Sequence, residues 1–410
     1  MSRLPLAGIF LLVCCGQLVT TQRSFLDMPL GVQLVRAVRN WMADSIGSTG
    51  DKNGDLYWAV QKQGKVQDPV PENVPFPCNI TAGRSESVPT SVDRLRPGDI
   101  DVIGAMGDSL TAGFGAFGSD MKTIFIENRG VTSLGGGQGT WRDTLTIPNI
   151  LKAFNPKLFG YCRKDAWNHE PAAEFNVAES ASMSRDMPFM AEILIKRMKN
   201  DPRVDIKNHW KLVSLFNGAN DFCSDMCWNP SPQDTVKNHK TDLIKVLRTL
   251  RDNLPRTLVS IVSAPHIRPV KEQKGRSRLC KLTFVAECSC LTGRQWRDQL
   301  QEFYDIMFSF QRVDDEVAAY PEFHREDFSV VVQPLFTDYA WPTVANGNAD
   351  FRYMSADCFH FSQLGNARMT YSLWRNMLEP VGKKSRFWTD IGVLPCPTEE
   401  RPYIATMGNS

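Results

Sequence analysis

Four short apolar stretches, separated by longer helical patterns, constrain the fold of this 410-residue chain more than any other feature. The stretches are rich in β-branched residues and have the length of buried strands. They lie at residues 100–106, 210–216, 257–264 and 328–336. Helical patterns occupy residues 186–200, 231–254, 294–313 and 362–378. Because strands that alternate with helices form parallel sheets covered on both faces, the sequence predicts an α/β fold with a mostly parallel sheet.

The residues ahead of the first predicted strand divide into a leader and an extension. Residues 1–22 combine a basic Arg3, a short apolar run and small residues, which is typical of a secretory signal peptide. Residues 23–98 form an N-terminal extension, and residues 99–410 form one α/β domain. No second long apolar run follows and the tail is polar, so we expect a secreted, extracellular protein without a transmembrane anchor.

Cysteine usage agrees with export. Two of the eleven cysteines, Cys14 and Cys15, lie in the leader, which leaves nine. In an oxidising compartment most of these should form disulfides, and an odd number leaves at least one free or intermolecular. Zinc is the alternative for Cys280, Cys288 and Cys290, but these lack the repeated spacing of a closed zinc site. The sequence therefore favours disulfides over metal.

Asn79 and the overall charge bear on modification and partners. Asn79, in "CNIT", is the only N-x-Ser/Thr acceptor without a blocking proline, and we expect a surface glycan there. The formal net charge is +2, with 22% charged residues, which gives no reason to expect a nucleic-acid partner. Nothing resembles a calcium loop or a catalytic zinc set, so no cofactor is expected.

Polar clusters follow three of the predicted strands. Ser109 stands in "GAMGDSLTAGFGA" after the first strand, "NGAND" (217–221) follows the second, and "DCFH" (357–360) follows the fourth. Ligands of open α/β sheets bind at the carboxyl ends of the strands, so the three clusters can converge on one edge. By itself, the glycine-rich stretch around Ser109 also fits an ordinary strand-to-helix corner.

A reactive serine needs a histidine base, which in turn needs an orienting acid. Asp357 lies three residues before His360 and can reach its Nδ1, leaving Nε2 for a serine. The alternative is an aspartate that caps a turn beside a half-buried histidine. Surface positions are expected for His169, His209 and His239, while His266 and His324 have no acid placed locally to orient them. A neutral His360 base predicts activity that falls as pH drops through about 6.5.

Donors for a developing oxyanion are offered by two segments. The side-chain amide of Asn220, in "NGAND", is one candidate, and Gly218 lets the backbone come close. The alternative is a turn that merely joins strand to helix. Farther back, "NVAESASMS" (176–184) is an Asn-led turn before a helix, whose backbone N–H groups could also face an anion.

Together, Gly-Asp-Ser-Leu, the Asn-led turn, Gly-x-Asn-Asp and the late Asp-x-x-His resemble the GDSL (SGNH) hydrolase family. The segments "IPNILKAFNPK", "MKNDP", "DFSVVVQP", "DCFHFS" and "LWRNMLEPVGKK" resemble its phospholipase B branch, from about Cys78 to the C-terminus. The resemblance implies a flavodoxin-like three-layer α/β/α fold and metal-free hydrolysis of phospholipid-type esters. It makes Ser109 the nucleophile, His360 the general base and Asp357 its orienting acid, and it places Asn220 and the Ser109 backbone amide in the oxyanion hole.

Two departures from the family pattern stand out. Five residues after Asn176 the family usually has glycine, and this chain has Ala181. Its backbone N–H remains available to the oxyanion hole if the local φ is negative. Membrane-bound phospholipase B relatives carry tandem units and a C-terminal anchor, whereas one unit and no anchor are expected here.

The expected function is that of a secreted serine esterase. It would act on phospholipid or lysophospholipid acyl esters at a micelle or membrane surface, through an acyl-enzyme. "FGAFG" (114–118) and "FCSDMCW" (222–228) are apolar enough for lipid contact, or could be ordinary core. One alternative keeps the triad but takes small or carbohydrate acyl esters. Another is a catalytically weakened extracellular lipid-binding protein, for which Ala181 is the only support.

Overall fold

The computed structural model describes residues 29–410; the expected leader, residues 1–22, lies outside the described residues. The chain divides into two compact units, Met1–Gly47 and Ser48–Ser410. In the first unit the described residues form helix α2 (Pro29–Ile46), which contains the helical pattern of the N-terminal extension. The second unit holds the sheet, and residues 48–98 of the extension also belong to it.

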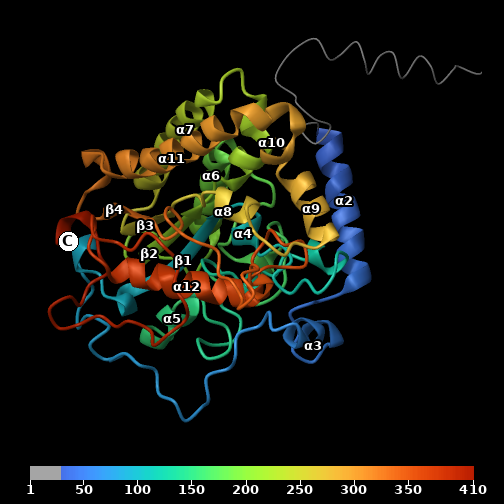
Figure 1. Ribbon diagram of the computed structural model, residues 1–410. Helices are drawn as coiled ribbons and strands as arrows, with labels where there is room; N and C mark the ends of the chain where they lie inside the picture. The colour runs from blue at the N-terminus through green and yellow to red at the C-terminus, as the bar shows by residue number, and fades with distance from the viewer. Residues whose placement is uncertain (1–28) are drawn as a thin grey trace, which may run out of the picture. The chain divides into compact units, whose positions relative to one another are not determined.

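A parallel four-stranded sheet, in the order β1-β2-β3-β4, forms the centre of the second unit (Figure 1). The strands are β1 (Ile100–Gly107), β2 (Trp210–Phe216), β3 (Thr257–Val262) and β4 (Phe328–Gln333). All four predicted strands are confirmed, with β3 and β4 ending two and three residues earlier than expected. Gly107, Phe216, Val262 and Gln333 stand in register, so the carboxyl ends of the strands form one level edge.

Helices cover both faces of this sheet, as the alternating pattern predicts (Figure 1). One face packs against α6 (Met187–Asn200), α7 (Gln233–Asn253) and the C-terminal part of α11 (Leu300–Ala318). The other face packs against α5 (Ile147–Phe154) and α12 (Gln363–Leu378). The helix predicted at 294–313 begins as a 3-10 segment, Arg294–Gln299, before α11. The α/β fold class is confirmed.

Shorter elements join these layers. The remaining α-helices are α3 (Asp55–Lys62), α4 (Ser109–Ala112), α8 (Arg268–Lys271), α9 (Arg278–Glu287) and α10 (Ser289–Thr292). A π-helical turn spans Asp221–Asp225. Single 3-10 turns lie at Val92–Arg94, Pro97–Asp99, Thr123–Phe125, Arg129–Val131, Pro171–Ala173, Ser184–Asp186, Met226–Trp228, Pro321–Phe323, Phe351–Tyr353 and Met407–Asn409.

The outer edge of β1 is paired with irregular chain rather than with a regular strand. Ile103 donates its backbone N–H to the Phe159 carbonyl at 3.0 Å, and Ala105 donates to the Phe175 carbonyl at 3.0 Å. Val177 donates back to the Ala105 carbonyl at 2.9 Å. This pairing brings the Asn-led segment 176–184 alongside the carboxyl end of β1.

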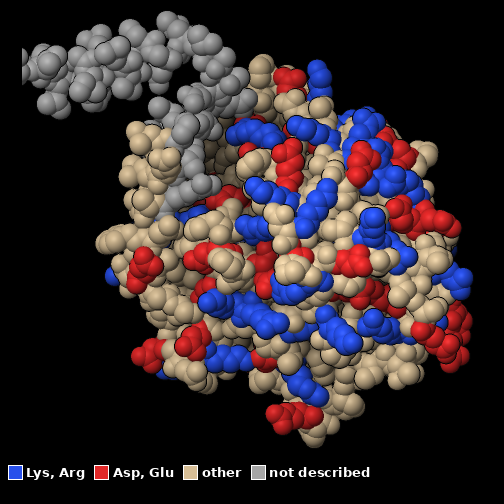
Figure 2. Space-filling model, turned by 180° about the vertical axis from the view of Figure 1, so that it is seen from behind, with Lys and Arg blue, Asp and Glu red and all other residues tan. Residues whose placement is uncertain are grey.

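Four disulfides confirm the expectation that most of the cysteines are paired: Cys78–Cys396, Cys223–Cys288, Cys227–Cys290 and Cys280–Cys358. Cys162 is the free cysteine among the described residues, and it is buried. The three cysteines weighed for zinc are each paired, which leaves them no thiolate to offer a metal. On the face shown in Figure 2, acidic and basic side chains are interspersed, in keeping with a net charge near zero.

Candidate active site

Ser109 lies at the corner where β1 passes into α4. Gly107 closes the strand with φ of +155°, and a Cβ there would lie 2.2 Å from the Phe216 carbonyl oxygen, so only glycine fits against β2. Asp108 caps α4 by accepting the Leu110 N–H at 2.9 Å. Ser109 is the first residue of the helix, where a backbone N–H has no partner within the helix. Its N–H and hydroxyl therefore occupy the carboxyl edge of the sheet together.

The three residues expected to form a triad lie in hydrogen-bond contact. His360 Nε2 is 2.7 Å from Ser109 Oγ, and His360 Nδ1 is 2.7 Å from Asp357 Oδ2. Asp357 is fully buried, while Ser109 and His360 are 7% and 6% exposed. The chain of acid, imidazole and hydroxyl is unbroken, which is the arrangement a histidine base requires.

The geometry of the Asp-x-x-His turn is compatible with both roles weighed for Asp357. Its Oδ1 accepts the backbone N–H groups of Phe359 and His360 at 2.9 and 3.0 Å, while its Oδ2 faces the imidazole. Cys358, between them, has φ of +60°, which closes the turn tightly. The aspartate is thus both a turn cap and a partner of the imidazole.

Burial and charge shift the proton equilibria of this cluster. Burial lowers the pKa of His360, but the charge and hydrogen bond of Asp357 outweigh it and raise this pKa to about 9. Burial opposes ionisation of Asp357, yet His360 and two backbone N–H groups hold the pKa of Asp357 below its ordinary value. Burial raises the pKa of Asp108 to about 6, against the Leu110 N–H.

Glu287, which the sequence did not single out, stands beside the triad. Its Oε1 lies 3.9 Å from His360 Nδ1, and its Oε2 is buried without a hydrogen-bond partner. Burial raises the pKa of Glu287 to about 8, partly offset by His360. Ligand atoms of Glu287, Asp357 and His360 lie within 4.8 Å of one another, the one such cluster among the described residues. The hydrogen bond between Asp357 and His360 already brings two of these three residues together.

The segments expected to supply oxyanion donors lie side by side. Asn220 Nδ2 donates to the Ser182 carbonyl at 2.9 Å, and Asn217 Nδ2 donates to the same carbonyl at 3.2 Å. A carboxamide carries two N–H hydrogens, so Asn220 retains a second donor. Gly107 accepts the Glu179 N–H and the Ser182 hydroxyl, both at 3.0 Å. Both donor segments are therefore anchored to the end of β1.

Ala181 adopts a backbone conformation that favours glycine. Its φ is +66°, in the left-handed region, so the negative φ on which its expected donor role depended is absent. For an L-residue this conformation costs about 1–2 kcal/mol. The alanine thus adopts a conformation that glycine reaches without this cost.

A buried arginine holds the Asn-led segment in place. Arg129 is fully buried, pairs with Glu127 at 2.6 Å and donates to the carbonyls of Asn176 and Ala178 at 3.2 and 2.7 Å. Asn176 Nδ2 in turn donates to the Thr111 carbonyl of α4 at 2.9 Å. This network links α4, which begins at Ser109, to the segment containing Ala181. No local pattern in the sequence marks this role of Arg129, because the carbonyls of Asn176 and Ala178 that it holds lie 47 and 49 residues away.

The expectation that His239 lies on the surface is wrong. His239 is 7% exposed, and its ring stacks on Phe310 at 3.5 Å. Its Nδ1 is 3.0 Å from Ser184 Oγ and its Nε2 is 2.9 Å from Asp314 Oδ1. The polar residues around it in sequence hid a core position, because α7 turns His239 toward α11. His169 is exposed, as expected.

Aromatic side chains flank the triad. The Phe114 and Phe359 rings lie 4.9 and 5.2 Å from the His360 ring, so part of "FGAFG" borders the site. Phe117 is instead buried in a satellite core, and Phe222 packs on Phe310 in the main core. Of these three side chains, Phe114 is therefore placed for contact with a lipid, whereas Phe117 and Phe222 belong to the core.

Comparisons with known proteins identify the family of the chain. Residues 103–373 match the family model described as GDSL-like Lipase/Acylhydrolase. Human "Phospholipase B1, membrane-associated" is 38% identical over 330 residues, which cover 80% of this chain and 22% of that protein. The rat and mouse proteins of the same description are 37% identical over the same shares. The chain thus spans about a fifth of the length of these curated relatives. Among the described residues, no helix has the length and hydropathy needed to cross a membrane.

Proposed function

The chain belongs to the GDSL-like lipase and acylhydrolase family, and on that premise we propose that it hydrolyses acyl esters of phospholipids and lysophospholipids. The observation that carries the proposal is the unbroken contact from Asp357 through His360 to Ser109, 2.7 Å at each step. The lipid preference is supported by the phospholipase name of relatives that match 80% of the chain, and by Phe114 and Phe359 beside the triad.

The reaction proceeds through an acyl-enzyme. Ser109 Oγ attacks the ester carbonyl carbon while its proton passes to His360 Nε2, and Asp357 stabilises the imidazolium that forms. The oxyanion of the tetrahedral intermediate accepts the free N–H of Asn220 and the backbone N–H of Ser109. The proton on Nε2 then moves to the departing alcohol as the carbon–oxygen bond breaks. His360 then takes a proton from water as the water oxygen attacks the acyl carbon. The bond from that carbon to Ser109 Oγ breaks, the proton on Nε2 returns to Oγ, and the fatty acid is released.

An active-site phosphonate separates this function from the non-catalytic alternative. The purified protein should be labelled at Ser109, and Ser109→Ala should lose labelling and turnover with an unchanged melting temperature. Labelling of another serine in Ser109→Ala would refute the assignment. Product identification on a panel of phospholipids, lysophospholipids and acetylated sugars then decides the substrate. Turnover confined to acetylated sugars would refute the lipid assignment and leave the triad intact.

Export of the protein is part of the proposal. It is supported by the four disulfides and by exposed Asn79, next to the disulfide-bonded Cys78. Intact mass before and after deglycosylation and reduction should reveal a processed chain with one glycan and four disulfides. A fully reduced chain that retains residues 1–22 would contradict export.

A further inference from the structure

Helix α9 presents an apolar face to solvent. Leu279, Leu282 and Val285 are 46%, 67% and 52% exposed, and their spacing of three residues places them on one side of the helix. The opposite side, with Cys280, Thr283 and Phe284, is buried. A helix apolar on both sides is normally covered on both sides. An exposed stripe of this kind marks an interaction surface.

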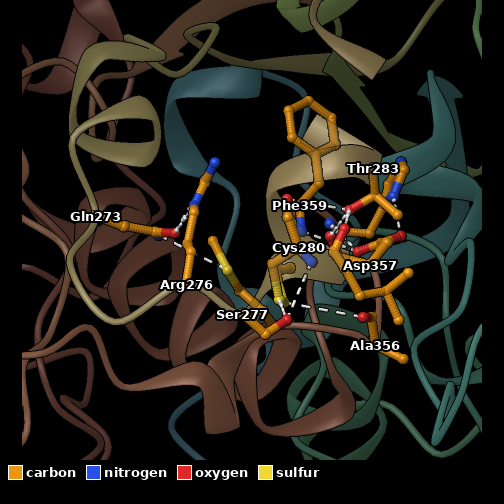
Figure 3. Close-up of a disulfide and its surroundings, with 12 residues drawn as sticks. Gln273, Arg276, Ser277, Cys280, Thr283, Ala356, Asp357 and Phe359 are labelled. Carbon is orange, nitrogen blue, oxygen red and sulfur yellow. Dashed lines mark hydrogen bonds and ion pairs between the residues drawn. A yellow bond between two sulfur atoms is a disulfide. The ribbon is translucent and has the colours of Figure 1, made fainter. Parts of the chain in front are cut away.

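The buried side of α9 is fastened to the triad loop (Figure 3). Cys280 forms a disulfide with Cys358, the residue that follows Asp357. Thr283 Oγ1 donates to the Asp357 carbonyl at 2.7 Å. At the end of the helix, Glu287 lies 3.9 Å from His360. Whatever binds the exposed side of α9 is therefore held next to the catalytic centre.

The chain that leads into α9 is basic. Residues 268–281 contain six lysines and arginines and a single acidic residue, Glu272, which pairs with Arg268. Lys274, Arg278 and Lys281 are exposed and make no ion pair within residues 29–410. Unpaired cations that border an apolar helix face match a surface with anionic headgroups over an apolar interior.

We propose that α9 docks the enzyme on a phospholipid surface. Leu279, Leu282 and Val285 enter the acyl layer, while Arg278 and Lys281 face the headgroup phosphates. The proposal rests on the proposed function for the identity of the lipid, since the surface then delivers substrate to the triad. The rigid link through Cys358 holds the triad at a fixed depth relative to the membrane.

Vesicle binding tests this surface separately from catalysis. The protein carries Ser109→Ala so that lipid is not consumed, and co-sedimentation is measured with vesicles of phosphatidylcholine alone or mixed equally with phosphatidylglycerol. Leu282→Gln/Val285→Gln should weaken binding to both vesicles about tenfold or more, because two apolar side chains no longer leave water. Lys281→Gln should weaken binding about fivefold, on the anionic vesicles only.

Val88→Gln is the matched control. Val88 is 61% exposed, and the neighbouring Pro89 carbonyl accepts the Trp210 Nε1–H at the opposite end of the sheet from Ser109. This variant should bind both vesicles normally. Equal melting temperatures would show that all the variants are folded.

Three results would overturn the proposal. The first is that the parent protein binds neither vesicle. The second is that Leu282→Gln/Val285→Gln binds as well as the parent. The third is that the parent sediments as a dimer and Leu282→Gln/Val285→Gln as a monomer. The last would assign the face to a second copy of the chain. The protein with Ser109 restored could also fail to cleave phospholipid while vesicle binding still depends on Leu282 and Val285. That result would refute the proposed function but would support the docking surface.

Discussion

Replacement of Asn220 separates oxyanion stabilisation from architecture. Asn220 and Asn217 both donate to the Ser182 carbonyl, at 2.9 and 3.2 Å, so alanine at either position removes one such bond. Asn217→Ala also removes a 3.3 Å bond to the Ser182 hydroxyl. Each loss should lower the free energy of unfolding by about 1 kcal/mol. Only Asn220 is proposed to hold a second N–H toward the oxyanion. Asn220→Ala should therefore also lose on the order of 10²–10³-fold in kcat, or about 2.7–4 kcal/mol of transition-state stabilisation.

The assay is steady-state hydrolysis of a soluble ester by wild type, Asn220→Ala and Asn217→Ala, with thermal melting of each. KM should change little in Asn220→Ala, because the interaction strengthens only as charge develops on the oxygen. Asn220→Asp should be at least as damaging, since it places a carboxylate where negative charge must form. Near-normal kcat in folded Asn220→Ala, or an equal loss of kcat in Asn217→Ala, would refute a donor role specific to Asn220.

Three further predictions follow from the site. Only neutral His360 accepts the serine proton, and its pKa is raised to about 9, so kcat/KM should fall as pH drops through about 9 rather than 6.5. A midpoint at or below 6.5 in the pH profile would show that Asp357 and Glu287 do not raise the pKa of His360. Ala181→Gly should relieve about 1–2 kcal/mol of backbone strain in the left-handed conformation, offset by about 0.5–1 kcal/mol of greater entropy in the unfolded chain. Chemical denaturation should therefore show equal or slightly higher stability, with kcat retained. A clear loss of stability would show that Ala181 is not strained. Arg129→Met removes the guanidinium that pairs with the buried Glu127 carboxylate. It should lower the free energy of unfolding in urea by about 3–5 kcal/mol, with a lower kcat in the folded fraction. A change below about 1 kcal/mol would show that Arg129 does not hold the Asn-led segment in place.

The sequence by itself predicts the features of this protein that depend on residues close together along the chain. The strands were predictable because a strand buried on both faces is mostly apolar, as β2 is apart from Lys211 and Ser214. The contact of Asp357 with His360 was predictable because His360 is the third residue after Asp357, so one turn brings them together. The convergence of Ser109 with His360, 251 residues apart, required the further rule that parallel strands end at a common edge.

The tertiary structure alone decided the features that depend on distant partners. Glu287 reaches the triad because a disulfide and Thr283 draw α9 onto the Asp357 loop, and no local pattern states that approach. His239 is buried because its partners, Ser184 and Asp314, lie 55 and 75 residues away. The sequence shows that an alanine stands at position 181, but its backbone conformation depends on how the Glu179 N–H and the Ser182 hydroxyl bond to the Gly107 carbonyl. Periodicity and short spacings report what a residue does within its own element, whereas burial, charge and strain depend on which other elements pack against it.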